Sequence, residues 1–434
     1  MSASLWVRWM AMQGVPRAFL SVRALRGDPL ARLLLGRAEP MERNLLFDRL
    51  RARGGLVRTP FVRVSADYEV CRSVLRDSRF GVTNPVGTGL PQPMPALMNW
   101  ADPGIPNPVE PPSMLMVDEP DHARYRRAVA HSFTPRAIER LGDRVETITA
   151  DLLAELTGDA DLLTGYAARL PVAVMADLLG LPDHMHPHLL EWGDSAAVLL
   201  DIGVSWAAFR RAVASLRHLD RYLHEHIPRI RRGELGETVL DPMITDPTLS
   251  HREIAANAAL LIDAGFETTV NLIGNGIVLL LENPGALARL RAEPALWPAA
   301  VEEILRLESP VQMTVRTAHR DVELAGERVA AGEMIILLLA GANRDPEIFA
   351  DPCRFDITRP NAREHLGFGA GAHVCLGAAL ARIEGAAALR GLFERFPALR
   401  LAAPPERRGL VTLYGYRRLS ADLGSPVRSP APGA

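Results

Sequence analysis

Apolar residues recur at helical spacing through most of the middle of the chain, from Asp118 to about Leu290. The clearest predicted helix begins after Ser250, because Ser250 and Glu253 match a capping box in which each side chain accepts a hydrogen bond from the other residue's free amide. Its apolar-rich run ends at Asn283-Pro284, since proline cannot continue a helix. At 1.5 Å per residue this helix is about 50 Å long, so we expect it to cross the whole domain.

Shorter elements are predicted on either side of this helix. A proline in the first turn marks a second helix, from Trp297 to just before Pro310. Alternating apolar positions predict short strands, and helical spacing returns before and after them. The predicted strands are 61–66, Val315–Ala318, Asp321–Leu324 and Met334–Leu339, and the other helices are Tyr68–Leu75 and Leu376–Phe393. The pattern therefore favours a mainly α fold with small β-sheets.

Three segments depart from this regular pattern. Residues 1–35 are a partly amphipathic lead-in, for which a helix packed on the body is favoured over peripheral membrane contact. Nine prolines fall between Pro85 and Pro112, and the apolar residues among them favour an ordered binding loop over a flexible linker. Residues 424–434 (GSPVRSPAPGA) are expected to form a disordered tail.

Composition narrows the class of protein. The 434 residues are 48% hydrophobic and 23% charged, which excludes a disordered or low-complexity chain, and the net charge of −2 gives no global attraction to nucleic acid. Cys71, Cys353 and Cys375 are far apart, so a disulfide framework is disfavoured and a reducing cytoplasm fits best. Arg8 and Arg17 interrupt any signal peptide, and no run reaches the roughly 20 apolar residues of a membrane span.

The stretch with the most specific chemistry is HLGFGAGAHVCLGAALARIE, residues 365–384. Cys375 stands at the start of a predicted helix, where free amides and the helix dipole favour a thiolate. Gly369 and Gly371 permit tight loop geometry, and Gly377 lets the backbone approach the sulfur. A thiolate with amide donors suits haem iron, although a lone cysteine at a helix start is more often a small core residue.

Ten residues of this stretch, Phe368 to Gly377, resemble the haem-binding loop of the cytochrome P-450 superfamily at every signature position. The resemblance is to soluble bacterial members of actinobacterial type. It implies a single cytochrome P-450 domain over residues 36–423, with haem b between the long helix and the cysteine loop. It also implies that Cys375 is the axial ligand of the haem iron and that Phe368 and Gly369 border the haem.

The middle of the long helix carries a second resemblance. A carboxylate and two β-branched hydroxyl residues are poor choices for a helix interior, and with Gly265 they predict a local widening or kink. Ala264-Gly265-Phe266-Glu267-Thr268-Thr269 is similar to the oxygen-activation motif of the family. The similarity implies that Thr268 holds water or oxygen and that Glu267 supplies protons. Ala264 and Gly265 would leave room for oxygen and substrate.

Two further matches concern residues that hold the cofactor and its loop. Glu303 and Arg306 lie three apart, as any surface ion pair might, but they resemble the ExxR motif of the family, with Arg359 as its third member. The resemblance implies a buried structural triad. It further implies a clamp on the haem propionates, formed by His122, Arg126, Arg316 and His373.

The activity implied is insertion of one oxygen atom of O2 into a C–H bond of a hydrophobic small molecule: a lipid, steroid, terpenoid or polyketide. Electrons are expected from a separate ferredoxin and its NAD(P)H-dependent ferredoxin reductase, and the protein is expected to be a cytoplasmic monomer. A patch for that donor is predicted from Arg124, Arg127, Arg354 and Arg382. A peroxide-using enzyme of the same fold and a haem-binding sensor stay open as alternatives.

The substrate pocket is expected to be apolar and rich in methionine. Its predicted wall is Met94, Leu97, Met98, Trp100, Leu261, Ala264, Gly265, Val311, Met313 and Val315, with Leu413 or Tyr414.

Overall fold

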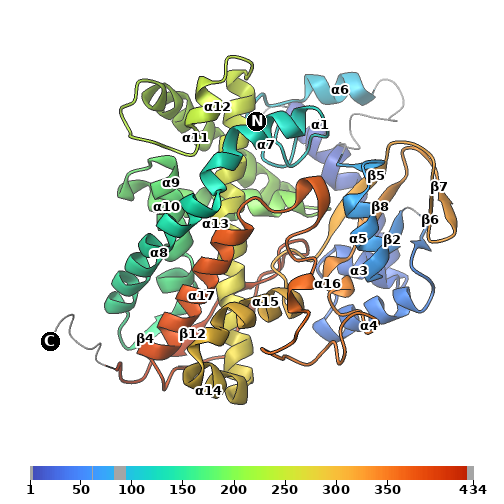
Figure 1. The fold of residues 1–434 in the computed structure, drawn as a ribbon. Helices are drawn as coiled ribbons and strands as arrows, with labels where there is room; N and C mark the ends of the chain where they lie inside the picture. The colour runs from blue at the N-terminus through green and yellow to red at the C-terminus, as the bar shows by residue number, and fades with distance from the viewer. Residues whose placement is uncertain (1–2, 61, 83–93, 428–434) are drawn as a thin grey trace.

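The computed structural model describes residues 3–60, 62–82 and 94–427 of the chain (Figure 1). Its α-helices are α1 Ala3–Trp9, α2 Val15–Leu25, α3 Pro29–Leu34, α4 Pro40–Arg51, α5 Tyr68–Arg76, α6 Met94–Trp100, α7 Asp121–Ala130, α8 Pro135–Glu155, α9 Arg169–Leu179, α10 His186–Ala197, α11 Trp206–Arg231, α12 Asp241–Thr245, α13 His251–Glu282, α14 Pro284–Ala292, α15 Trp297–Leu307, α16 Leu339–Ala342 and α17 Ala378–Arg395. The strands are β1 Val57–Arg58, β2 Arg63–Ser65, β3 Phe80–Gly81, β4 Asp159–Asp161, β5 Thr314–Ala318, β6 Val322–Leu324, β7 Glu327–Val329, β8 Met334–Leu337, β9 Arg400–Leu401, β10 Glu406–Arg407, β11 Tyr416–Arg418 and β12 Ser420–Asp422.

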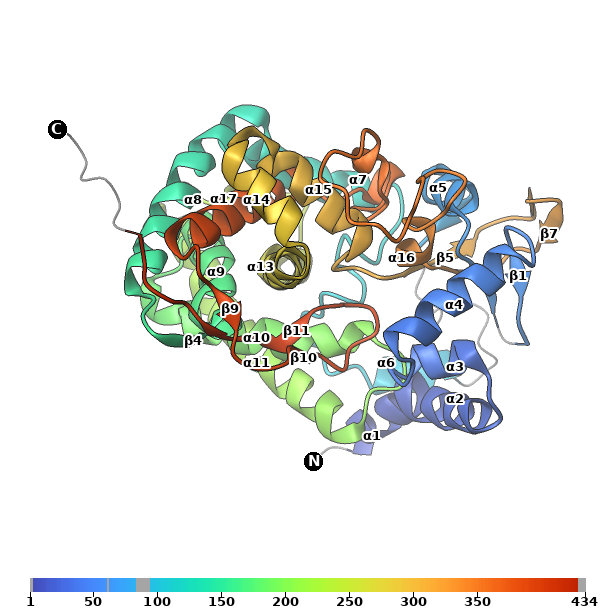
Figure 2. The same ribbon diagram turned by 90° about the horizontal axis from the view of Figure 1, so that it is seen from below.

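The long central helix is confirmed as α13, with 32 residues. The Ser250 and Glu253 capping box is present at its start, and α14 begins directly after Asn283. Figure 2 looks along α13, with α14, α15 and α17 on one side of it and α10, α11 and the β10–β11 pair on the other. By length and composition α13 could cross a membrane, but 78% of its most apolar window is buried inside the protein, as in a core helix of a soluble domain.

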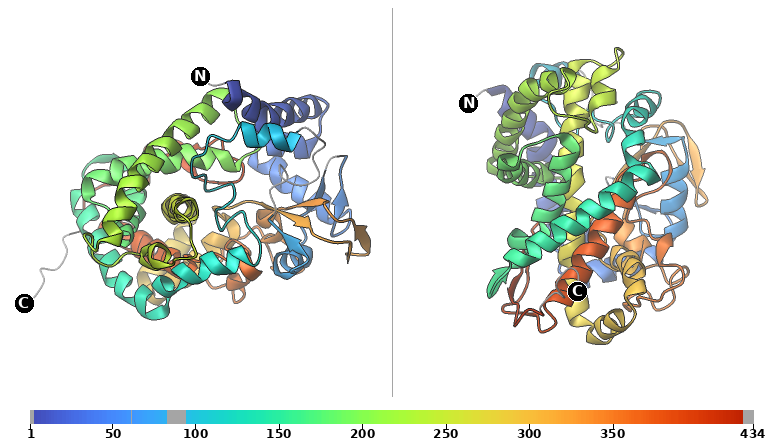
Figure 3. Two further views of the ribbon diagram at one scale, coloured as in Figure 1. Left: turned by 90° about the horizontal axis from the view of Figure 1, so that it is seen from above. Right: turned by 60° about the vertical axis from the view of Figure 1, so that its left-hand side comes forward.

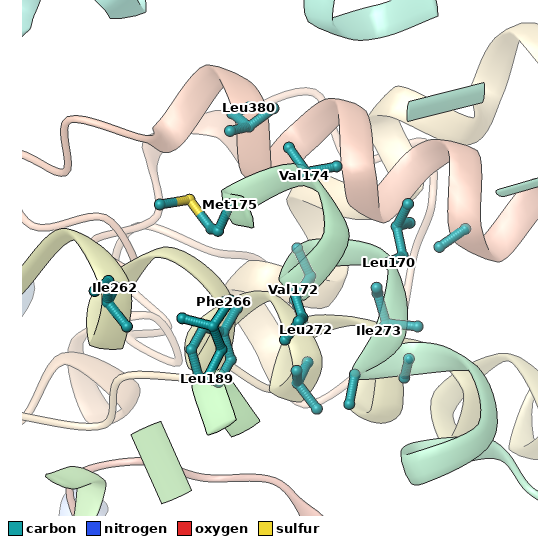
Figure 4. Close-up of a cluster of buried hydrophobic side chains, with 14 of the residues drawn as sticks. Leu170, Val172, Val174, Met175, Leu189, Ile262, Phe266, Leu272, Ile273 and Leu380 are labelled. Atoms are coloured by element: carbon teal, nitrogen blue, oxygen red, sulfur yellow. The ribbon is translucent and has the colours of Figure 1, made fainter. Parts of the chain in front are cut away.

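Helices pack around α13 to form the main hydrophobic core. Phe266 and Ile262 of α13 lie beside Met175 of α9 and Leu189 of α10, while Leu272 lies further along the same helix (Figure 4). The right-hand view of Figure 3 shows α8 running along α17, and Arg390 of α17 donates to Glu146 of α8 at 2.5 Å. This packing fixes the orientation of α13, which carries part of the site.

The second part of the molecule is built on a five-stranded sheet with the order β1-β2-β8-β5-β3. β2 and β8 are parallel, with Arg63 opposite Ile335, and the other neighbours are antiparallel. Phe47 of α4 and Tyr68 of α5 are buried in the two smaller cores around this sheet. β5 is an interior strand, paired on one side with β8 and on the other with β3, so Arg316 at its middle is held in a fixed place.

The N-terminal segment packs on the body, as predicted. The Trp9 indole donates to the Val204 carbonyl at 2.8 Å, and Oε1 of Gln13 accepts from the Gly203 amide at 2.7 Å. At the other end, the Val427 amide donates to the Arg395 carbonyl at 2.9 Å. The chain is therefore held as far as Val427, and the rest of the predicted disordered tail, 428–434, lies outside the described residues.

Candidate active site

The cysteine loop forms a tight turn between the sheet part and α17. Its Cys375 amide donates to the Phe368 carbonyl at 2.9 Å. Gly369 and Gly371 have φ angles of +68° and +72°, where side chains are strained, and a Cβ on Gly371 would lie 2.1 Å from the Leu75 carbonyl oxygen. The predicted need for glycine at these two positions is therefore confirmed.

Cys375 itself precedes α17 by three residues and is exposed. Protein packed around its sulfur has the largest influence and raises the pKa of the thiol. A hydrogen bond from the Gly377 backbone, and the charges of Arg126 and Arg382, act in the opposite direction. A coordinated metal ion removes the proton of a thiol outright. The hydrogen bond from Gly377 and the positive charges of the two arginines would then stabilise the resulting thiolate.

A buried ion-pair cluster lies behind this loop. Arg306 donates to both carboxylate oxygens of Glu303, at 2.7 and 2.8 Å, and both side chains are fully buried. Arg359 donates to the same carboxylate at 3.2 Å, and Arg306 also donates to the carbonyls of Asn343 and Pro352. The triad of Glu303, Arg306 and Arg359 thus ties α15 to the segment that leads into the cysteine loop.

A second cluster beside the triad escaped the sequence analysis. Glu302 accepts from His365 at 3.1 Å and from Arg382 at 2.7 Å, and His365 in turn accepts from the Gly367 amide at 3.0 Å. Burial raises the pKa of Glu302, but the hydrogen bonds from His365 and Arg382 outweigh it and bring that pKa to about 2. The sequence did contain one indication of this cluster, the adjacent glutamates 302 and 303. Only Glu303 belongs to the ExxR motif, so Glu302 needs a partner elsewhere if it is buried.

Three of the predicted clamp residues lie near one another beside the loop, and the fourth, Arg316, interacts with Asp118, which lies 3.9 Å from His373. The rings of His122 and His373 lie 4.1 Å apart between centroids, and Arg126 is close enough to influence both His122 and Cys375. The guanidinium of Arg316 is buried and, within the described part of the chain, donates only to Thr314 and the Val315 carbonyl. Burial lowers the pKa of Arg316 to about 10.

These residues fit a haem. A buried guanidinium that forms no ion pair with a described carboxylate is costly, and the two propionates of a haem would supply anions for it. Cys375, an exposed residue of the adjoining loop, would supply the sulfur ligand of the iron. A Cβ on Gly377 would meet no atom within 4 Å, which leaves open space next to the sulfur.

On α13 the residues of the predicted oxygen-activation motif lie in different environments. Ala264 is exposed although the helix around it is mostly buried, and the Thr268 hydroxyl donates to the Ala264 carbonyl at 3.2 Å. The helix is continuous, so the predicted widening is absent. A Cβ on Gly265 would lie 2.5 Å from Sδ of Met175, so the absence of a side chain here lets α13 pack closely against Met175 of α9.

Glu267 is buried and directed elsewhere. Its carboxylate accepts from Arg408 and, at 3.4 Å, from Asn271. Arg408 also pairs with Asp194, whose side chain is exposed, so an ion-pair chain runs from Glu267 to the surface. Within the described residues no hydrogen bond joins Glu267 to Thr268, although the two are neighbours in sequence.

The predicted pocket wall is only partly in place. Met98 and Met313 are buried, and Val315 is 39% exposed next to Arg316. Trp100 is 60% exposed, and the Tyr414 ring lies between the guanidinium groups of Arg43 and Arg407, at 4.4 and 4.1 Å. Because its ring already packs against two arginines, Tyr414 is a poor candidate for the pocket wall, and Leu413 is the better candidate of the two. The Met94 side chain lies outside the described residues.

The molecule is a mainly α domain that combines a cysteine loop, buried cationic side chains and a central helix on which Ala264 is exposed. This combination is the one expected of a haem-thiolate protein. Comparison with known proteins agrees. The family model "Cytochrome P450" matches residues 218–407. A Mycobacterium tuberculosis protein described as a cytochrome P450 140 is 43% identical over 433 residues, covering 98% of each chain.

Two solved structures give the same assignment. Ligand-free CYP164A2 of Mycobacterium smegmatis has a TM-score of 0.79 and 35% identity, covering 91% of this chain and 99% of its own. P450BioI, in complex with an acyl carrier protein ligated to hexadec-9Z-enoic acid, has a TM-score of 0.79 and 33% identity, covering 87% and 98%. The chain belongs to the cytochrome P450 family. It is a P450 monooxygenase with haem b as cofactor, and it acts with O2, a substrate and a redox partner.

Proposed function

We propose that this enzyme inserts one oxygen atom of O2 into a C–H bond of a hydrophobic small molecule, of lipid, steroid, terpenoid or polyketide class. The observation that carries the substrate class is the exposure of apolar residues on interior elements, Ala264 on α13 and Val315 on β5. Apolar surface on such elements is stabilised when an apolar molecule covers it. The related P450BioI, whose solved complex holds a fatty acyl chain, is consistent with this class.

The residues around the cofactor have distinct proposed roles. Cys375 would bind the haem iron, and His122, Arg126, Arg316 and His373 would hold the propionates. The carbonyl of Phe368 fixes the Cys375 amide, while Gly369 shapes the loop. When bound, the haem supplies the activation of O2, which a thiolate ligand favours by donating electron density.

Thr268 and Glu267 divide the handling of protons. The Thr268 hydroxyl, on the exposed step of α13, can turn from the Ala264 carbonyl to hold a water molecule near the reacting oxygen. Glu267 can exchange protons with solvent when its pair with Arg408 opens toward Asp194. This route takes protons along the β10–β11 side of α13, away from the cysteine loop.

Electrons would come from a separate ferredoxin with its NAD(P)H-dependent reductase, in the cytoplasm and to a monomeric enzyme. Two members of the predicted donor patch are already neutralised: Arg124 pairs with Glu253, and Arg382 with Glu302. Arg354 is exposed but lies 3.5 Å from the Asp356 carboxylate, so Arg127 is the exposed member that forms no ion pair with a described residue. The proposed patch is therefore smaller than the sequence suggested.

Replacement of the ligand tests the core of this proposal. We expect the reduced carbon monoxide complex to show the red-shifted Soret band of a thiolate-ligated haem, and Cys375→His to lose both that band and product formation. Cys353→Ser and Cys71→Ala are matched controls that should retain both. A thiolate spectrum that survives Cys375→His would refute the assignment.

The substrate class and the donor need separate measurements. A panel of fatty acids, steroids, terpenoids and macrolides should contain ligands that shift the Soret band of the holoenzyme. Such a ligand should also raise oxygen consumption and give a hydroxylated product with a surrogate ferredoxin system. A ligand-induced shift without oxygen consumption would instead favour a haem-binding sensor.

A further inference from the structure

A groove rich in arginine lies at the N-terminal end of the fold, away from the cysteine loop. Its volume is about 380 Å³, and α2, α4, β1 and the turn before α3 form its walls. We call α2, α3, α4 and β1 the N-terminal unit. The groove is lined by four arginines, Arg23, Arg26, Arg53 and Arg58, and by one acidic residue, Asp28.

The positive charge of this groove is largely uncompensated. Asp28 pairs with Arg23 at 2.6 Å, whereas Arg26, Arg53 and Arg58 form no ion pair with any described residue. Residues 1–53 hold ten arginines against four acidic residues, in a chain whose overall net charge is −2. The global charge therefore conceals a local cationic field that would attract an anion.

An apolar surface adjoins the groove. Val15, Val22 and Leu25 share one face of α2, since they are seven and ten residues apart, and they are 58%, 50% and 84% exposed. Leu25 directly precedes Arg26 of the groove. Trp6 of α1 adds a fourth exposed apolar side chain, at 48%. Monomeric soluble domains rarely leave such residues together in water.

We propose that the N-terminal unit docks on an anionic lipid surface. Lipid phosphates would occupy the arginine groove, and Val15, Val22 and Leu25 would enter the boundary between headgroups and acyl chains. Exposed apolar residues on one helix face, bordered by arginine, are the features by which helices bind at the interface of a membrane without crossing it. A second copy of this chain is a poorer occupant, because symmetric docking would bring the unpaired arginines of both copies together.

The position of this surface suits a lipophilic substrate, a point that rests on the proposed function. The N-terminal segment is bonded to α6 and to the loop before α11: Arg8 donates to the Met98 carbonyl at 3.3 Å, and Trp9 donates to the Val204 carbonyl at 2.8 Å. Figure 3, left, shows α6 beside the N-terminal helices. Lipid docking would therefore hold the predicted binding loop close to the membrane in which such a substrate dissolves.

Vesicle co-sedimentation of the holoenzyme tests the proposal. We expect binding to vesicles of phosphatidylcholine with about 30% phosphatidylglycerol, because the anionic lipid supplies the negative surface potential that attracts arginine. Binding to phosphatidylcholine alone should be much weaker. Arg26→Glu with Arg58→Glu should weaken binding at least about tenfold, and Val22→Ser with Leu25→Ser by a similar factor. Arg140→Glu on α8 and Val427→Ser, exposed changes elsewhere, are the matched controls.

Each result decides between occupants. Full binding by the serine variant would overturn insertion, leaving electrostatic adsorption alone. Binding of wild type abolished by inorganic phosphate at constant ionic strength, with no difference between vesicle types, would indicate a free-anion site instead. A concentration-dependent dimer in sedimentation velocity, lost in the serine variant without any lipid binding, would assign the face to a second copy. The carbon monoxide spectrum of every variant checks the haem site independently.

Discussion

Thr268 and Glu267 are adjacent on α13, but their side chains have different hydrogen-bond partners. The Thr268 hydroxyl donates to the Ala264 carbonyl within α13, whereas the Glu267 carboxylate accepts from Arg408, which lies outside the helix. Thr269, the next hydroxyl, is close to the buried Glu384 of α17, whose pKa is raised by burial to about 8. Of the three side chains, only that of Thr268 lies beside the exposed Ala264, and this is why we propose Thr268 as the group that handles protons near the substrate.

Removal of this hydroxyl should uncouple the reaction. Thr268→Ala should keep the fold and the haem, but the ratio of product to NAD(P)H consumed should fall by about tenfold, with hydrogen peroxide in its place. The reason is that no group then holds water for proton delivery. Product, NAD(P)H and peroxide are measured together. Thr269→Val serves as the control, and equal coupling in both variants and wild type would contradict the role given to Thr268.

Glu302 should stabilise the fold in a way that depends on pH. Its pKa is about 2 in the folded chain and about 4.5 when unfolded, so the stabilisation is complete above 4.5 and is lost as pH falls through 2. We expect Glu302→Gln to lower the free energy of unfolding at pH 7 by about 1–3 kcal/mol, because His365 and Arg382 lose a carboxylate.

Thermal unfolding of the holoenzyme across pH measures this effect. The difference in Tm between wild type and Glu302→Gln should be largest above pH 5 and should shrink toward pH 2. Glu293→Gln, an exposed acid at the end of α14, is a control without that pH dependence. A constant difference at every pH would show that Glu302 is not held ionised by its partners.

At the scale of elements, α7 carries residues of two kinds, some in the proposed haem clamp and some directed to other partners or to the surface. His122 and Arg126 belong to the proposed propionate clamp, while Arg124 pairs with Glu253 at the start of α13 and Arg127 is exposed. A spacing of one helical turn places His122 and Arg126 on one face. One helix can thus hold the cofactor and also present a cation to an electron donor.

Charge reversal at Arg127 tests that outer face. We expect Arg127→Glu to slow the first electron transfer from an acidic ferredoxin several-fold at low ionic strength and much less at high, since screening weakens encounter. Stopped-flow reduction of the substrate-bound enzyme gives the rate, and Soret titration should show unchanged substrate affinity. Arg217→Glu on α11, across α13 from α7, is the control. Identical rates with a flat salt dependence would place the donor elsewhere.

At the scale of the whole molecule, the Glu303, Arg306 and Arg359 triad joins the helical part to the cysteine loop. Loss of one partner leaves an uncompensated buried charge, which costs about 3–5 kcal/mol. Arg306→Leu should therefore yield protein with little bound haem, and Arg306→Lys should recover only part, because lysine cannot reach the same carbonyls. The ratio of haem to protein after purification measures the effect. Arg291→Leu, on α14, should keep the wild-type ratio.

The sequence by itself determined the parts that depend on local signals. Caps and prolines gave the ends of α13 and α15, glycines gave the cysteine loop, and the family motifs gave the class of enzyme. Tertiary structure decided the partners. Glu302 meets His365 across 63 residues and Glu267 meets Arg408 across 141, and the N-terminal arginines gather in a groove that no sequence motif marks. Local signals act within a few residues of the chain, whereas these pairs depend on how whole helices and strands pack.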